Sequence, residues 1–295
     1  MSAIHGFIFA GMLSFQPLRF LSILILSVLV TACSTTRMLY DNAPWLLQTK
    51  VSAYLDLDST QNETVGQQID RLFLWHRETE LPIYAALMTG LADDLADGLS
   101  APELERFLRG LERARYRLVQ QAVPEMAKLF TQLSPDQIAH FDGQVRESWA
   151  EEKILSEMPI EDRQVKRAAR WIDRFSEFYG ALEPDQRRLI QSAITNDPDF
   201  QPMRLRQKLQ RHTEFIAFLY EFPSPGAIAD RLHWAWDDLD ASLSATYRNA
   251  QTASLEATKR MILDVDAHMS GPQRARAIRR ILSYRDDFTA LAADK

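Results

Sequence analysis

Apolar side chains recur at every third or fourth position through most of this chain. The recurrence is clearest in four segments, at residues 104–118, 168–182, 228–247 and 255–269. Side chains with this spacing lie on one face of a helix, where they can be buried together. No segment shows the sustained alternation of apolar and polar residues that is typical of a half-buried strand. The pattern therefore predicts an all-α fold.

Short segments of a common form separate the predicted helices. In each, an apolar residue is followed by a short polar or acidic residue, often by proline, and then by Asp, Glu or Gln. This order is typical of a helix start, because the polar side chain accepts from free backbone N–H groups and proline fits the first turn. The segments are unevenly spaced, which favours an irregular antiparallel helical bundle or array of helical hairpins, with a repeat superhelix as the alternative. They are residues 57–61, 99–103, 133–137, 182–186 and 269–273, with 222–225 as a looser member.

Prolines predict where these helices are interrupted. Pro82 and Pro124 should kink or divide helices, because proline lacks a backbone N–H. The Asn-Asp-Pro sequence at 196–198 indicates a break, whereas the unbroken pattern after Pro225 predicts one long helix. No linker composition marks a domain boundary, and a division into two subdomains stays open near residues 157–160 or 196–202.

An apolar run at residues 20–30 leads to small residues and then to Cys33, the only cysteine of the chain. The run has the length of a signal-peptide apolar region and is too short for a membrane-spanning helix, which needs about 20 residues. The segment that ends at Cys33 resembles the lipobox of bacterial lipoproteins. This resemblance implies cleavage before Cys33 and attachment of acyl chains, such as palmitate, that together hold a protein firmly on a membrane. Because Ser34 and not aspartate follows, it also implies the outer membrane, facing the periplasm.

Other interpretations of this N-terminal segment stay open. They are a plain cleaved signal with an incidental cysteine and an uncleaved anchor, and Met12 is a second candidate start. On the lipoprotein interpretation, residues 1–32 are the signal peptide and 33–295 form one periplasmic helical domain, with 33–44 as a short tether. A single cysteine permits no disulfide within the chain, so the fold depends on its apolar core. The formal net charge of −6 argues against nucleic acid as a main partner.

Three blocks of sequence carry a further resemblance. They are Leu39-Tyr40-Asp41-Asn42 with Trp45-Leu46, Tyr54-Leu55-Asp56-Leu57 with Gln61, and Trp75-His76-Arg77 with Glu80-Leu81-Pro82-Ile83-Tyr84. In this order they resemble a family of Gram-negative lipoproteins with a domain of unknown function, which implies an envelope location and a helical fold but no chemistry. Segments 57–61 and 133–137 also resemble the Leu-Thr-x-x-Gln motif of small periplasmic stress chaperones, although Ser, Asp or Glu replaces the threonine.

The densest group of reactive side chains comprises Trp75, His76, Arg77 and Glu80. A helix would put His76 and Glu80 on one side, and the following proline could expose the group in a groove. The alternative is that Trp75 is a core anchor and that the charged residues are solvated. No catalytic or cofactor-binding motif accompanies the group, so we expect no cofactor and no enzyme activity. Three pairs four residues apart offer only two metal ligands each, and we expect no metal site: His76 with Glu80, His233 with Asp237, and Asp264 with His268.

Two rows of arginine follow helical spacing. They could bind lipid phosphates or an acidic segment of an envelope protein. Glutamate and aspartate are interleaved with them, which instead favours charge-paired surfaces facing solvent. The rows are Arg106, Arg109, Arg113 and Arg117, and Arg163, Arg167, Arg170 and Arg174.

These features together favour a membrane-anchored helical lipoprotein with a non-enzymatic binding or adaptor function in the cell envelope. Its partners would be the membrane, through acylated Cys33, and an envelope protein or lipid phosphate. The alternative hypothesis is a chaperone-like holdase that shields unfolded envelope proteins.

Overall fold

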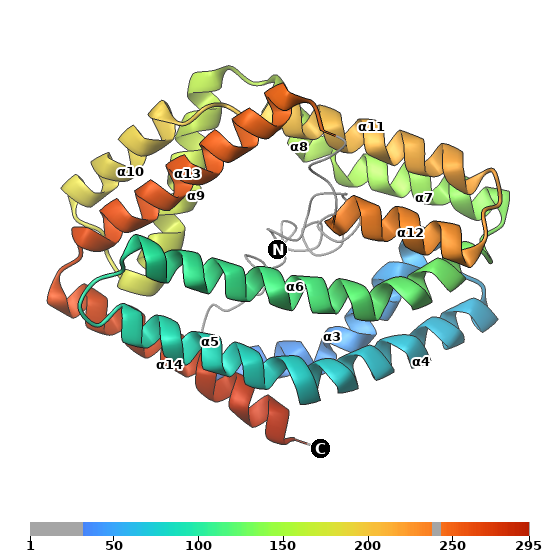
Figure 1. Cartoon of the computed structure of the whole chain (residues 1–295), viewed down its shortest axis with the longest axis horizontal. Coiled ribbons are helices and arrows are strands. Elements are labelled where there is room, and N and C mark those ends of the chain that lie inside the picture. The colour runs from blue at the N-terminus through green and yellow to red at the C-terminus, as the bar shows by residue number, and fades with distance from the viewer. Residues whose placement is uncertain (1–31, 238–242, 295) are drawn as a thin grey trace.

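The computed structural model describes residues 32–237 and 243–294, and it describes side chains from residue 36 onwards. The expected signal peptide therefore lies outside the described residues, except for Ala32. The described ranges are helical and contain no strand, so the fold is all-α (Figure 1). No helix within them is both long and apolar enough to cross a membrane.

The helices follow one another with short connections. The first part of the chain forms α3 (Ala32–Leu55), α4 (Ser59–Trp75), the π-helical turn η1 (His76–Glu80), α5 (Leu81–Asp94), α6 (Ala101–Phe130), α7 (Pro135–Ser148) and α8 (Ala150–Glu157). The second part forms α9 (Ile160–Tyr179), α10 (Pro184–Asn196), α11 (Gln201–Leu219), α12 (Pro225–Asp237), α13 (Ala245–Ala267) and α14 (Gly271–Ala293).

The predicted helix starts of the common form are confirmed. At each one, the side chain of the N-cap residue and the side chain three residues later accept from each other's backbone N–H groups. This arrangement pairs N–H groups that the first helical turn leaves free, and one such cap contributes about 1 kcal/mol. The N-caps of α4, α6, α7, α10 and α14 are Asp58, Ser100, Ser134, Glu183 and Ser270.

Only some of the helix breaks predicted from the prolines are observed. A break does follow α10, and Pro82 does lie in the first turn of α5, but Pro124 stays inside the continuous helix α6. The single long helix predicted after residue 225 is wrong, because α12 and α13 are separate. The hydroxyl of Ser244 caps α13 by accepting from the N–H of Tyr247 at 3.1 Å. Apolar spacing continues across this point, so it could not reveal the second start.

The N-terminal end of α3 replaces the expected tether. Residues 33–44 form the first half of this helix, which continues through Pro44. Cys33 lies in its first turn, while the cysteine side chain is outside the described ones. Any group attached to Cys33 is therefore joined directly to a helix.

Three groups of buried apolar side chains hold the helices together. The first joins α3, α6, α7, α11 and α12 around Val123 and Ile228, and the second joins α5, α6 and α14 around Leu81. The third joins α9, α10 and α13 around Ile190 and Val265. In Figure 1, α6 crosses the middle of the molecule, α5 and α14 lie along its lower edge, and α10 and α13 lie at the upper left. The apolar core is thus distributed over several hairpins.

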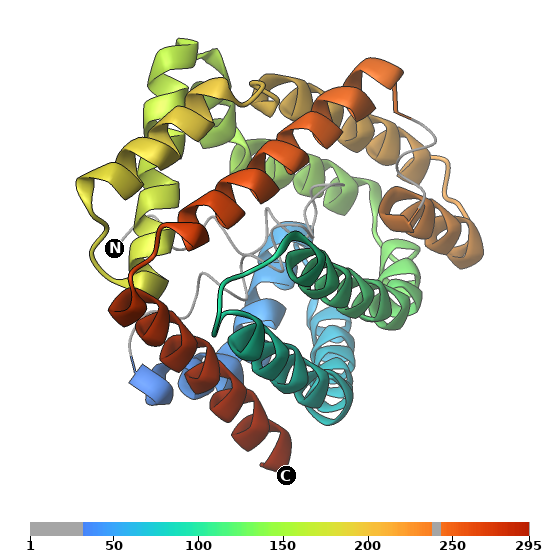
Figure 2. The same ribbon diagram turned by 60° about the vertical axis from the view of Figure 1, so that its left-hand side comes forward.

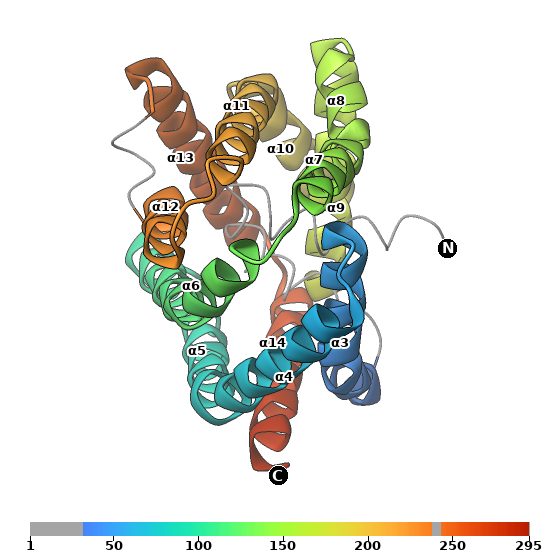
Figure 3. The ribbon, with the colours of Figure 1, turned by 90° about the vertical axis from the view of Figure 1, so that its right-hand side faces the viewer.

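Two sets of four helices pack in the same way. In the first set, one connection joins α3 to α4 and another joins α6 to α7, and α3 packs on α7 while α4 packs on α6. Figure 3 shows α3 beside both α4 and α7. In the second set, one connection joins α9 to α10 and another joins α13 to α14, and α9 packs on α14 while α10 packs on α13. Figure 2 shows this second set, coloured from yellow-green to dark red, on its left side. We call the meeting points of the connections the first and second junctions.

Candidate functional site

His76 of the predicted reactive cluster lies where α4 passes into α5 through η1. Its Nδ1 atom is 2.9 Å from the hydroxyl of Tyr40 on α3, and its ring meets that of Tyr84 on α5 edge-on. Burial lowers the pKa of His76 to about 4, so its imidazole is neutral near pH 7. His76 therefore joins helices as an uncharged packing residue.

Glu80 is fully buried and forms a two-pronged ion pair with Arg117 of α6. The Nε atom of Arg117 donates to Oε1 at 2.6 Å, and Nη2 donates to Oε2 at 2.8 Å. A buried carboxylate loses its hydration and needs such a partner in compensation. The same hydrogen bonds raise the pKa of Arg117. A member of the predicted cluster thus binds a member of the first arginine row and ties η1 to α6.

Arg77 makes contacts nearer the surface. Its Nη2 atom donates to the carboxylate of Asp41 at 3.0 Å, and Nη1 donates to the backbone carbonyl of Asp294 at 3.2 Å. Its guanidinium also lies over the ring of Tyr40. Trp75 is half-buried against His76. The cluster considered as a possible groove therefore takes part in packing among α3, η1, α5, α6 and the end of the chain.

The first arginine row lies on α6, and each of its members has a partner. Arg106 donates to Asp94, Arg109 donates to Glu105 at 3.5 Å, and Arg117 binds Glu80. Arg113 donates to the backbone carbonyl of Arg109 at 3.3 Å. This row is largely neutralised by neighbouring acids, as the interleaved charges indicated.

The second arginine row lies on α9, and its first two members bind the connection between α10 and α11. Arg163 forms an ion pair with Asp199 and donates to the backbone carbonyl of Met158. Arg167 forms an ion pair with Asp197, which is buried. These two arginines fix α9 to the following hairpin and are not available to a ligand.

Arg170 and Arg174 are the two arginines of these rows that make neither a hydrogen bond nor an ion pair among the described residues. Arg113 also lacks a carboxylate partner, but it donates to a backbone carbonyl. Within the described part of the chain, no carboxylate lies at ion-pair distance from the guanidinium of Arg170 or Arg174. Arg174 lies over the ring of Trp171, 5.3 Å from its centre. Desolvation and the guanidiniums of Arg167 and Arg204 lower the pKa of Arg170, and desolvation with Arg170 lowers that of Arg174. Positive charge on this part of α9 is therefore not neutralised by an ion pair.

The two arginine rows do not come together. Among the described residues, no hydrogen bond or ion pair joins a member of one row to a member of the other. Helix α13 contacts both regions, because its Lys259 binds Glu105 of α6 and its Ser254 donates to Asp197, the partner of Arg167. One turn beyond Arg174, Glu177 is 3.8 Å from Arg280 of α14. The rows are separate surfaces. Among the described residues, Arg170 and Arg174 are the only members of the rows with neither a hydrogen bond nor an ion pair, and we call the face of α9 that carries them the α9 surface.

Glutamine side chains pair at the first junction, a contact that sequence reasoning missed. Nε2 of Gln137 donates to Oε1 of Gln61 at 2.7 Å, and Nε2 of Gln61 lies 3.4 Å from Oε1 of Gln137. Each amide also donates to the facing connection, Gln61 to the carbonyl of Gln132 at 3.1 Å and Gln137 to that of Asp56 at 2.8 Å. Two helix starts are thereby joined through reciprocal amide contacts.

The second junction repeats this arrangement with different residues. The amides of Gln186 and Gln273 donate to each other at 2.9 and 3.0 Å. Gln186 also donates to the carbonyl of His268, and Gln273 to that of Ala181, both at 2.9 Å. At both junctions, the carbonyl belongs to the residue just before the apolar residue of the facing segment. The two helix sets therefore share the same glutamine pairing and the same positions of the carbonyl acceptors.

A sequence signal for the junctions was present in the helix-start segments. Four of the five end in glutamine, and these four glutamines form the two pairs. The fifth segment ends in Glu103, whose carboxylate accepts from the N–H and hydroxyl of its own cap residue, Ser100. A glutamine at the end of a helix-start segment therefore marks a segment that pairs with a second helix start. A glutamate there only caps its own helix.

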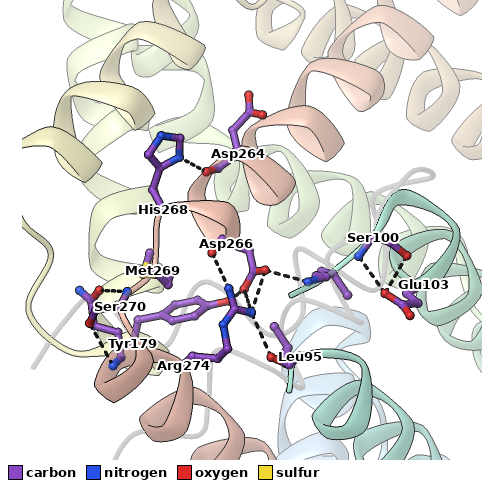
Figure 4. A network of polar contacts seen from close by, with 12 residues as sticks. Leu95, Ser100, Glu103, Tyr179, Asp264, Asp266, His268, Met269, Ser270 and Arg274 are labelled. Carbon is purple, nitrogen blue, oxygen red and sulfur yellow. Dashed lines mark hydrogen bonds and ion pairs between the residues drawn. The ribbon is translucent and has the colours of Figure 1, made fainter. Parts of the chain in front are cut away.

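A buried carboxylate close to the second junction fixes three segments of the chain. Asp266 of α13 accepts from the hydroxyl of Tyr179 at 2.9 Å, from the N–H of Leu99 at 2.8 Å and from Nη1 of Arg274 at 3.0 Å (Figure 4). Arg274 also donates to the backbone carbonyl of Leu95 at 3.0 Å. The network connects the α5–α6 connection to α9, α13 and α14. It raises the pKa of Tyr179, through burial first and then through Asp266.

The histidines do not gather into a metal site within the described residues, where no three potential ligands come together. Nδ1 of His233 contacts Gln120, and Nδ1 of His268 contacts the backbone carbonyl of Asp264 and not its carboxylate. His212, which the sequence did not single out, is fully buried with Nε2 at 2.7 Å from Asp142. Burial lowers its pKa, although the Asp142 carboxylate acts in the opposite direction.

Comparison with known proteins adds a family and no activity. No curated protein matches the chain, and no solved structure matches it. Residues 53–248, more than half of the chain, match a family of unknown function, DUF6279. The matched part includes η1, both arginine rows and the first junction, and it ends inside α13. The chain therefore belongs to the DUF6279 family.

Proposed function

We propose that this protein is a lipid-anchored, non-enzymatic binding protein of the bacterial cell envelope. Acylated Cys33 would hold it at the periplasmic face of the outer membrane, and the α9 surface would bind an acidic segment of another envelope protein. The observation that carries the proposal is that, among the described residues, Arg170 and Arg174 have no ion-pair partner. The location rests on the lipobox alone.

The chemistry of the α9 surface supports an acidic partner. Arg170 and Arg174 are four residues apart, so their side chains are neighbours along one face of the helix. A guanidinium offers several N–H donors in a planar fork that matches a carboxylate or phosphate. Lys166, one turn before Arg170, is exposed and lies on the same face as the two arginines. Three cations spaced along one helix face suit an extended acidic segment better than a single phosphate group.

The burial of the predicted reactive side chains also favours a binding function over catalysis. Glu80 is fully buried in its ion pair, and His76 is neutral and hydrogen-bonded to Tyr40. A general acid or base must reach a substrate proton, and these groups instead contact other helices.

Crosslinking in intact cells tests the proposal. A photoreactive amino acid at Lys166, which is exposed beside the arginines on α9, should give one or a few discrete protein adducts. The double variant Arg170→Glu and Arg174→Glu should lose them through charge repulsion. The matched control, Arg109→Glu with Arg113→Glu on α6, reverses the same amount of charge and should keep them. Equal adducts in all three proteins would refute the proposed surface, and an unmodified Cys33 in mass analysis would refute the anchor.

A chaperone-like holdase is the second candidate. It is favoured by large apolar side chains that lie exposed away from the three cores, namely Ile154, Val165 and Phe222. A holdase should suppress the aggregation of unrelated denatured proteins, whereas a dedicated binding protein should not. An aggregation assay with two unrelated denatured enzymes therefore separates the candidates.

A further inference from the structure

Within the described part of the chain, no other helix covers the large apolar side chains on the outer face of the first half of α3. Met38 is 68% exposed, Trp45 is 64% exposed and Leu46 is 38% exposed. Met38 and Trp45 are seven residues apart, which places them on the same side of the helix. The opposite side packs inward, where Tyr40 meets the ring of Phe73. Exposure of the Trp45 ring to water is unfavourable, so a partner that covers it would stabilise this face.

The same face begins next to the proposed attachment point. Helix α3 is continuous from Ala32 through Pro44, so Cys33 and Trp45 belong to one helix. At about 1.5 Å per residue, Met38 lies roughly 8 Å and Trp45 roughly 18 Å along the axis from Cys33. An acyl group inserted in a bilayer keeps Cys33 at the lipid surface. Without a tether, the neighbouring turns of α3 stay close to that surface.

The side chains of this face suit the boundary between lipid and water. Tryptophan has an apolar ring with one N–H donor and concentrates at membrane interfaces. One acid, Asp41, lies on the exposed side of α3, but it is paired with Arg77 at 3.0 Å. The carboxylate charge is therefore compensated before it approaches lipid.

We propose that the first half of α3 lies along the bilayer surface, with Met38 and Trp45 inserted at the level of the lipid headgroups. This inference rests on the proposed acylation of Cys33 and adds an orientation to it. The acyl chains already attach the protein firmly to the membrane. The contact between α3 and the lipid therefore determines the orientation of the protein on the membrane and not whether it is bound. The occupant of the face is the phospholipid bilayer that carries the anchor.

The test uses a fluorescent probe on the acylated full-length protein. Asn42, exposed between Met38 and Trp45, is replaced by cysteine and labelled with an environment-sensitive fluorophore. The native sulfur is acylated, so only the new thiol reacts. The protein is reconstituted into vesicles of phosphatidylethanolamine and phosphatidylglycerol, and intact mass verifies acylation. The control carries the same label at Phe222, which is 67% exposed between α11 and α12.

The expected result is a shift of the residue-42 probe to shorter wavelength, with quenching by a spin label near the lipid headgroup. The residue-222 probe should emit as in water. Adding Met38→Glu and Trp45→Glu should abolish the shift while acylation and circular dichroism stay unchanged.

Three outcomes overturn the inference. An acylated protein whose two probes both emit as in water refutes the lipid contact alone and leaves the proposed function standing. A shift that grows with the ratio of protein to lipid shows contact between copies of the chain and also refutes it. An unmodified Cys33 removes the proposed anchor and the inference together.

Discussion

Replacing Gln186 with leucine should destabilise the protein much more than the same change at Gln61. Gln186 accepts from the N–H of Glu183 at 2.8 Å and from Gln273 at 3.0 Å, and it donates to Gln273 and to the carbonyl of His268, both at 2.9 Å. With each hydrogen bond contributing about 0.5–1.5 kcal/mol net, losing four amounts to about 2–6 kcal/mol.

Gln61 provides a matched control because it makes the same set of contacts. It accepts from Asp58 and Gln137, and it donates to Gln137 and to the carbonyl of Gln132. Gln186 is only 5% exposed, whereas Gln61 is partly exposed, so water can replace its lost partners. We therefore expect Gln61→Leu to cost about 1 kcal/mol.

The assay is urea unfolding of each purified variant, followed by far-ultraviolet circular dichroism. The double variant at Gln186 and Gln273 should cost less than the sum of the single variants, with a coupling of about 0.5–3 kcal/mol, because the two side chains share bonds. Equal costs at Gln186 and Gln61, or strict additivity at the second junction, would refute the account of the junctions as hydrogen-bonded units.

Three other changes test the buried polar groups. Arg117→Met leaves the carboxylate of Glu80 buried without a partner and should lower the free energy of unfolding by about 3–5 kcal/mol in urea denaturation; a loss below 1 kcal/mol contradicts this. The pKa of His76 is lowered from 6.5 to about 4, so between these pH values the histidine is protonated in the unfolded chain and neutral in the folded protein. The free energy of unfolding should therefore fall as the pH drops from 6.5 towards 4. His76→Gln should flatten that decline. Asp266→Asn should speed hydrogen exchange at the Leu99 amide, and unchanged exchange would count against the network.

Local signals made the fold class and the helix starts predictable. A capping box depends on two residues three apart, such as Ser134 and Gln137, so the sequence contains all of it. The helix predicted after residue 225 failed because apolar spacing alone does not register a cap, and Ser244 starts a new helix within an unbroken pattern.

Contacts between distant residues were not predictable in the same way. Glu80 and Arg117 were both singled out, yet in different roles, because nothing in the sequence indicates that η1 packs on α6. The pairing of Gln61 with Gln137 depends on how two helix starts meet in space. The arginines of α9 look alike in sequence, and only the path of the chain after α10 gives Arg167 a carboxylate and leaves Arg170 without one.

The second junction has a practical consequence for how this protein can be divided. The family match stops at residue 248, whereas Gln273, Asp266 and all of α14 come later. A fragment limited to residues 53–248 would lack α14, which packs on α5, and would leave Gln186 without its partner Gln273. We therefore expect the smallest part that folds on its own to extend beyond the residues that match the family.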